Sequence, residues 1–392
     1  MTSISAAPAD LRAAPASASR NLALDRARTF LTLVVLVHHA VIPYTHFGHT
    51  DPTSWIGFDA VVLATDSFFM AMFFFLSGLF VWPSLRHKSP GSFVRDRLLR
   101  LGLPFAIAAI TVIPVAYYAI ELRHHPTTGF AEFWWKTVTI GPWPSGPLWF
   151  VWVLLVFDLT ASLLYRIAPN LPDPINRLSL RGFERPTEFF LFLVVLTAVA
   201  YVPARLYFGS NHWFEWGPFS VQASRVLLYA AYFFVGAGVG AASFDRGLLG
   251  ADGQLAKNPS GWAIATLVPY CALWGLIFIK REILGNPEHL PRWYDGIYGM
   301  LFVVFSAAMM FLILALFLRF RRGGWSVLDP MQKDAYGIFL VHYAFALWIQ
   351  YWLFDFDLPA IIKVLIGYAF MLTLSWALTA GLRRIPGATK VL

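Results

Sequence analysis

The chain contains one cysteine, Cys271, and few charged residues. A single cysteine excludes a disulfide within the chain, and the CxxC and His/Cys spacings of structural zinc sites are absent, so we expect no metal. Only 13% of the residues are charged, against about 25% in soluble globular proteins. The formal charge of +8 does not point to nucleic acid, because basic residues also gather in the cytoplasmic loops of membrane proteins.

Apolar sequence is abundant instead, since 58% of the residues are hydrophobic. Runs of about 18 or more apolar residues, long enough to cross a bilayer as a helix, recur along the chain. They predict an all-α membrane protein, a polytopic bundle of about ten transmembrane helices. The expected spans are residues 27–46, 56–82, 98–120, 146–166, 188–206, 224–243, 261–280, 297–319, 334–353 and 359–382.

The distribution of charge predicts the orientation of this bundle. If the N-terminus is cytoplasmic, most of the 30 lysines and arginines fall in cytoplasmic segments, and the positive-inside rule then places both termini in the cytoplasm. Residues 1–20 lack the apolar core of a signal peptide and are expected to be a disordered cytoplasmic tail. Residues 21–385 form one transmembrane domain, and residues 386–392 form a cytoplasmic C-terminal tail.

The first span carries ionisable residues that are costly in a membrane and therefore point to function. Arg28 and His39 are 11 residues apart, which places them on one helix face and roughly 16 Å apart along the axis. His39 would lie near mid-membrane and Arg28 at the cytoplasmic interface, where Asp25 could hold its guanidinium. The alternative is that Arg28 anchors the helix and His39 only bonds to a neighbouring helix.

Two further spans are expected to bring polar groups to similar depths. In the second span Asp66 and Ser77 share a face, and Asp66 could orient the imidazole of His39. In the ninth span His342 lies near the middle, where a neutral imidazole could act as a general base. Structural hydrogen bonds between helices are the alternative for each.

Arginines open the third span at its cytoplasmic side. Arg97 and Arg100 are three residues apart and share a face, and paired guanidiniums bind phosphate through two hydrogen bonds each. Binding of lipid headgroups is the alternative to a phosphate site.

Several short motifs follow one another in a fixed order over residues 22–350. They are Arg28-x10-His39, Phe74-Phe75-Leu76-Ser77-Gly78, the arginines from Arg95 to Arg100, Leu148-Trp149-Phe150, Phe233-Phe234-x-Gly236, and Tyr336 to His342. Together they resemble the acyltransferase family 3 of integral membrane O-acyltransferases. Ala71-Met72 and the stretch 146–150 are more similar to the branch that contains glucan biosynthesis protein C, a glucan succinyltransferase.

The resemblance implies transfer of an acyl group, acetyl or succinyl, from cytoplasmic acyl-CoA to a hydroxyl of a cell-envelope glycan, at the inner membrane of a bacterium. No permanently bound cofactor is implied. The implied catalytic residues are His39 as general base, Asp66 and His342. The implied acyl-CoA ligands are Arg28, Arg97 and Arg100, and the implied substrate contacts are Trp149, Ser77 and Tyr336. A succinyl carboxylate would need a further cation, for which Arg205 and Lys363 are candidates.

Two other classes of protein remain open. A transporter or flippase could use intramembrane histidines and aspartates as a proton relay. A membrane scaffold or sensor would leave the polar faces of the first two spans without a purpose. Consumption of acyl-CoA distinguishes the enzyme from both. The oligomeric state is not predicted.

Overall fold

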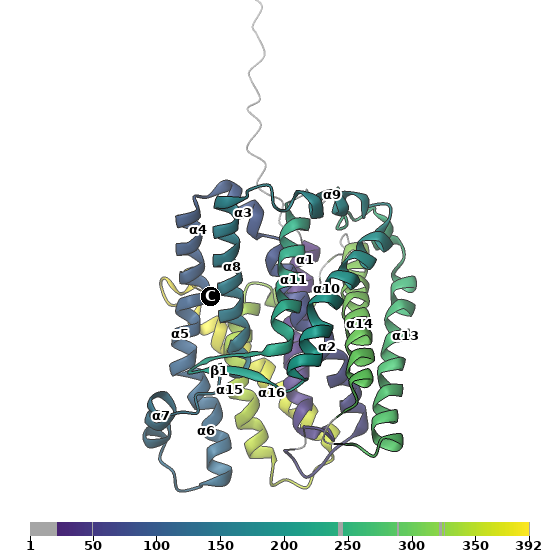
Figure 1. The fold of residues 1–392 in the computed structure, drawn as a ribbon. Coiled ribbons are helices and arrows are strands. Elements are labelled where there is room, and N and C mark those ends of the chain that lie inside the picture. Colours follow the sequence, from purple (N-terminus) through teal and green to yellow (C-terminus); the bar gives the residue numbers. More distant parts are fainter. Residues whose placement is uncertain are drawn as a thin grey trace, which may run out of the picture.

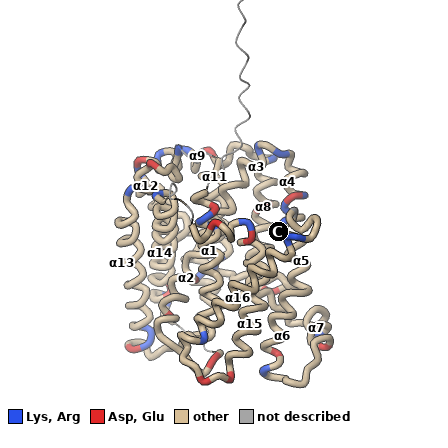
Figure 2. Tube along the Cα trace, turned by 180° about the vertical axis from the view of Figure 1, so that it is seen from behind, with Lys and Arg blue, Asp and Glu red and all other residues tan. Residues whose placement is uncertain are grey.

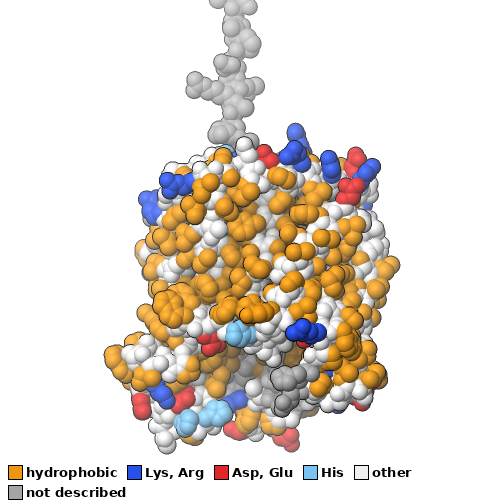
Figure 3. All heavy atoms as spheres, in the orientation of Figure 1, with side chains coloured by type: hydrophobic (Ala, Val, Ile, Leu, Met, Phe, Trp, Pro, Cys, Tyr) orange, Lys and Arg blue, Asp and Glu red, His pale blue; other side chains and the backbone are white. Residues whose placement is uncertain are grey.

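The computed structural model describes residues 22–48, 50–241, 246–287, 290–320, 324 and 326–391. The predicted tail, residues 1–20, lies outside them, and the predicted C-terminal tail is described up to residue 391. Helices make up most of the described part of the chain, and the long helices run along roughly one common direction (Figure 1). Hydrophobic side chains cover most of the visible side of the bundle in Figure 3, as expected for a surface that faces lipid.

The elements have the following bounds. The helical elements are α1 (Leu22–Val41), η1 (Ile42–Tyr44), α2 (Ile56–Gly78), α3 (Val81–His87), α4 (Pro90–Arg97), η2 (Leu98–Gly102), α5 (Leu103–Ile110), α6 (Val112–His124), α7 (Phe130–Thr139), η3 (Gly146–Leu148), α8 (Trp149–Ile167), α9 (Asp173–Arg181), α10 (Pro186–Phe208), η4 (Ala223–Arg225), α11 (Val226–Gly240), α12 (Gln254–Lys257), α13 (Pro259–Phe278), η5 (Ile279–Ile283), α14 (Arg292–Arg319), η6 (Asp329–Met331), α15 (Ala335–Leu353), α16 (Ala360–Leu382) and η7 (Ala388–Lys390). The strands are β1 (Trp213–Trp216) and β2 (Phe219–Gln222).

Within the described residues, nine helical stretches are long and apolar enough to cross a membrane. They correspond to nine of the ten predicted spans. The remaining predicted span, 334–353, forms α15, which is a helix of 19 residues but falls outside the nine because it carries polar side chains such as His342 and Gln350. The all-helical, multi-pass membrane fold is thereby confirmed.

The bundle places α1 and α2 at its centre. In Figures 1 and 2, α4, α5, α6 and α8 lie on one side of this pair, and α13 and α14 lie on the other. Lys and Arg gather at the end that carries α3, α4 and α9, which we call the basic end (Figure 2). At that end Arg26 of α1 binds Asp329 through two hydrogen bonds of 2.7 Å. This guanidinium and the Ser326 backbone N–H lower the pKa of Asp329 to about 2.

Glycines allow α2 and α11 to pack with their backbones in contact. A Cβ atom on Gly78 would collide with the carbonyl of Phe233, and Cβ atoms on Gly236 and Gly240 would collide with the carbonyls of Phe75 and Leu79. Small residues commonly permit this close approach between membrane helices. The Phe-Phe-x-x-Ser-Gly and Phe-Phe-x-Gly motifs therefore meet each other, and their glycines serve the packing.

Two features were not predicted: a π-helical turn within the third span and a hairpin between the fifth and sixth spans. Residues 98–102 form a π-helical turn, η2, between α4 and α5, a geometry that often marks functional sites. Strands β1 and β2 form an antiparallel hairpin that pairs Trp213 with Gln222. Gly217, with φ of +56°, supplies the turn that an L side chain would disfavour.

Two polar or reactive side chains lie outside the predicted site. Cys271 is exposed on α13. Asp59 is buried and accepts hydrogen bonds from the backbone N–H and the ring of His46 at 2.9 and 2.7 Å.

Candidate functional site

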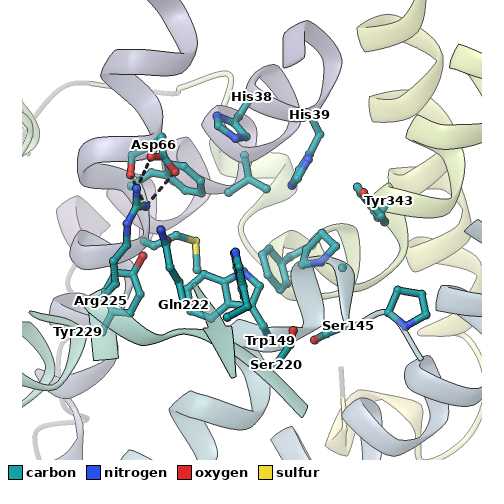
Figure 4. A pocket seen from close by; sticks show the side chains of 18 of the residues that line it. His38, His39, Asp66, Ser145, Trp149, Ser220, Gln222, Arg225, Tyr229 and Tyr343 are labelled. Atoms are coloured by element: carbon teal, nitrogen blue, oxygen red, sulfur yellow. Dashed lines mark hydrogen bonds and ion pairs between the residues drawn. The ribbon is translucent and has the colours of Figure 1, made fainter. Parts of the chain in front are cut away.

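A central cavity of about 370 Å³ lies within the bundle. Figure 4 shows its walls, which come from α1, α2, α11, α15, the η3–α8 junction and the β-hairpin. Its polar lining includes His38, His39, Asp66, Ser145 and Arg225. Segments far apart in the sequence therefore place titratable groups around one space.

His39 points into this cavity from α1 (Figure 4). Its ring contacts those of His342, Tyr343 and His38, at centroid distances of 5.2, 5.0 and 5.3 Å. The ring nitrogens of His39 have no hydrogen-bond partner among the residues that the structure describes. The imidazole is thus positioned by packing, and its nitrogens remain open to a ligand in the cavity.

His38 lines the same cavity, but its ring is tied to α2. The Thr65 hydroxyl donates to the Val61 carbonyl at 2.8 Å, so its oxygen accepts the Nδ1–H of His38, also at 2.8 Å. This bond fixes the tautomer and the orientation of His38.

His342 lies behind His39, outside the cavity wall. Its Nδ1–H donates to the Phe339 carbonyl at 2.6 Å, which leaves the lone pair on Nε2. That Nε2 atom is buried and has no hydrogen-bond partner in the described structure. The structure therefore brings the ring of His342 against that of His39 but does not place His342 in the lining of the cavity.

Asp66 is paired with Arg225, not with His39. The two guanidinium NH₂ groups of Arg225 donate to the two carboxylate oxygens at 2.9 and 2.5 Å (Figure 4). The guanidinium also lies over the Phe302 ring, 5.0 Å from its centroid. The expected orientation of His39 by Asp66 is corrected, because the carboxylate is already engaged by a cation.

Aromatic rings and a buried hydroxyl form the opposite wall. Trp149 stacks on Tyr229, with centroids 5.3 Å apart and an interplanar angle of 26°, and Trp213 of β1 also lines the cavity. Gly146 adopts φ of +49°, and this left-handed turn carries the chain from Ser145 into α8. The Ser145 hydroxyl is buried without a partner among the described residues.

A second, basic cavity of about 520 Å³ opens at the basic end. Arg28, Arg97, Arg100 and Ser77 all line it, so the predicted acyl-CoA ligands share one space. Arg28 pairs with Asp25 at 3.6 Å, as its spacing predicts.

The cations of the basic cavity differ in whether they form ion pairs with carboxylates. Arg97 contacts the buried Asp158 at 3.3 Å, and Lys88 contacts Asp96 at 2.5 Å. Arg100, which is exposed on the π-helical turn, forms no ion pair with any described residue. It is therefore the cation most available to an anionic ligand.

The central and basic cavities share none of their described lining residues. Three rings in mutual contact, which we call the phenylalanine layer, separate the two cavities. They are Phe73 and Phe150, which line neither cavity, and Phe339, which also lines the central cavity. Their centroids are 5.6 to 6.2 Å apart. Along α2 the lining passes from Met70 in the central cavity to Ser77 in the basic cavity, with Phe73 between them.

Three other predicted candidates lie elsewhere. The Tyr336 hydroxyl donates to the Arg100 carbonyl at 2.8 Å, and Tyr336 lines neither cavity. Lys363 pairs with Asp51 at 3.0 Å in a buried site. Arg205 pairs with Asp295 at 2.9 Å. Neither of these two cations reaches the central cavity, so neither serves an acyl carboxylate there.

A family model described as an acyltransferase domain, that of acyltransferase family 3, matches residues 21–380. The chain belongs to acyltransferase family 3. No curated protein and no solved structure matched it. The membership implies an enzyme that transfers an acyl group other than an aminoacyl group, so the transporter and scaffold readings are set aside.

Sequence reasoning missed several residues of this acyltransferase. Arg225 directly precedes α11, and one sequence cannot show that it faces Asp66 on α2. Glu215 and Gln222 line the cavity from a hairpin that a search for long apolar runs does not detect. Ser145 had a usable signal, since it precedes the Gly-Pro that starts the Trp149 helix.

Proposed function

We propose that this membrane acyltransferase moves a short acyl group from acyl-CoA in the basic cavity to a hydroxyl of an envelope glycan in the central cavity. The observation that carries the proposal is on one helix: Arg28 of α1 lines the basic cavity and His39 of α1 lines the central cavity. An extended pantetheine arm is comparable to the roughly 16 Å between them. The basic end would face the cytoplasm of a bacterium, which supplies acyl-CoA.

The anionic head of CoA would bind at the arginines of the basic cavity. Arg100 offers an unengaged fork of donors, and Arg28 and Arg97 add positive charge beside it. The neutral pantetheine arm would pass the phenylalanine layer and bring its thioester to His39. No permanently bound cofactor is needed for this transfer.

The chemistry follows from the position of His39. Its imidazole accepts the proton of the acceptor hydroxyl while the oxygen attacks the thioester carbonyl carbon. The carbon–sulfur bond then breaks, and the imidazolium returns the proton to the departing thiolate. His342 holds the ring of His39 from behind, and the buried hydroxyl of Ser145 is available to donate to the developing oxyanion.

The acceptor would enter at the end opposite the basic end. The central cavity shares Ser145, Glu215 and Ser220 with a neighbouring cavity of about 420 Å³, and Trp143 lines that neighbour. Trp149 and Trp213 present ring faces on which a sugar can pack. A glycan is therefore a suitable acceptor, and a periplasmic glucan, as in the glucan biosynthesis branch, is one member of this class.

The test compares histidine variants in purified, reconstituted protein. His39→Ala should lower acyl transfer by about 10²- to 10⁴-fold, because the general base is lost. His124→Ala, which removes an exposed histidine at the end of α6, is the matched control and should retain full activity. Release of free CoA measures turnover, and size-exclusion chromatography checks folding. Full activity in His39→Ala together with inactive His38→Ala would assign the base to His38 and contradict the proposal.

A further inference from the structure

The charge of the central cavity selects the kind of acyl group that fits it. An acyl chain whose carbonyl carbon lies at His39 extends away from the CoA and into the central cavity, because His39 lines that cavity. The side chains there consequently meet the far end of the acyl group. This argument rests on the proposed function.

Three fully charged side chains line the central cavity in the described structure, and they are Asp66, Glu215 and Arg225. The only cation of the three is already paired with one of the two carboxylates. Both terminal nitrogens of Arg225 bond to Asp66, while its Nε, which has no partner among the described residues, is buried beside the Phe302 ring. The charge of Arg225 is therefore balanced by Asp66, and the other carboxylate of the cavity has no counter-charge there.

Glu215 is the carboxylate of the central cavity that is not paired with Arg225. It lies on β1 opposite Ser220, it is exposed, and it forms no ion pair with any residue that the structure describes. The neighbouring cavity that it also lines carries no lysine or arginine among its described lining. The unbalanced charge of the central cavity is thus a carboxylate.

We infer that this enzyme selects an uncharged acyl group, such as acetyl or propionyl, and disfavours a dicarboxylic group such as succinyl. An acyl carboxylate would lie in the same cavity as Glu215 without a compensating cation, and like charges repel strongly where water is partly excluded. Glu215 is then a specificity-determining residue. An uncharged or amino-bearing sugar fits beside it better than an acidic sugar.

The experiment measures donor preference with the full chain in liposomes. The donors are acetyl-CoA, propionyl-CoA and succinyl-CoA, and the acceptor is a carbohydrate extract of the source organism's envelope. CoA release gives kcat/KM, and mass spectrometry identifies the acylated product. Acetyl transfer should exceed succinyl transfer by about tenfold or more.

Two variants should change the acetyl-to-succinyl ratio for different physical reasons. Glu215→Lys supplies a cation, and Asp66→Asn releases Arg225, so each should bring the acetyl-to-succinyl ratio toward one. Glu282→Lys makes the same change of charge on the exposed η5 turn and should leave the ratio unchanged. Succinyl transfer equal to or faster than acetyl transfer in the unmodified enzyme overturns the inference, as does an unchanged ratio in both cavity variants. Failure of every donor to release CoA would instead overturn the proposed function.

Discussion

The pairing of Asp66 with Arg225 is a case in which two charges depend on each other. Removing one partner of a buried pair leaves an uncompensated charge and costs about 3–5 kcal/mol, whereas replacing both with apolar groups is often neutral. Asp66 faces a cavity and is 42% exposed at its side chain, so the cost of a single removal here lies below that range.

We therefore predict non-additive stability for this pair. Arg225→Met alone should lower the thermal stability in detergent, because it leaves Asp66 unpaired, and adding Asp66→Asn should restore much of the loss. Lys363→Met should also destabilise the protein through Asp51, but Asp66→Asn should not rescue it. Equal losses in Arg225→Met and in the double variant would show that the two residues do not stabilise each other.

The residue scale also shows what one sequence can and cannot predict. The helical period placed Arg28 and His39 on one face of α1, and each lines a cavity. Contacts between residues on different helices were harder to predict. Asp66 was expected to contact His39 but binds Arg225. A helical pattern gives the depth and face of a residue, whereas its partner depends on how the helices are arranged around one another.

At the scale of elements, the close contact of α2 with α11 depends on glycines, which carry no side chain. Gly236 has the Phe75 carbonyl where a Cβ atom would lie, while Gly275 of α13 has no atom within 4 Å of that position. The same substitution should consequently have opposite effects in these two helices.

Gly236→Ala should destabilise the protein by about 1–3 kcal/mol, because α2 and α11 must separate to admit the methyl group. Gly275→Ala should be neutral or stabilising by up to about 1 kcal/mol, because alanine favours the helix. Thermal unfolding in detergent compares the two variants. A loss in Gly275→Ala as large as that in Gly236→Ala would mean that close packing is not the cause.

The spans were predictable at this scale because hydrocarbon thickness imposes a long apolar run on each crossing helix. The predicted spans correspond to helices in the structure, although their ends differ, as in the third span, which begins with α4 at Pro90. The hairpin was not predictable in the same way, since its strands are four residues long and their pairing depends on a turn.

The whole molecule has an orientation that its basic end predicts. The single cysteine allows a direct measurement, because Cys271→Ser gives a background without cysteine. In that background Arg95→Cys, on α4, should react with a membrane-impermeant maleimide only from the cytoplasmic side. His125→Cys, after α6, should react only from the opposite side. Labelling of both from one side would contradict the proposed topology and the separation of donor from acceptor.

Under the proposed function, the phenylalanine layer would have an electrical consequence for the cell. A thin apolar barrier between two polar cavities concentrates the transmembrane voltage across itself, and moving one elementary charge through 100 mV is worth about 2.3 kcal/mol. Under the proposed function, transfer of an uncharged acyl group would send an acyl unit outward in exchange for the proton that returns with the thiol. In the terms used for transporters this would be an electroneutral exchange, so the proposed reaction would modify the cell surface without drawing on the membrane potential.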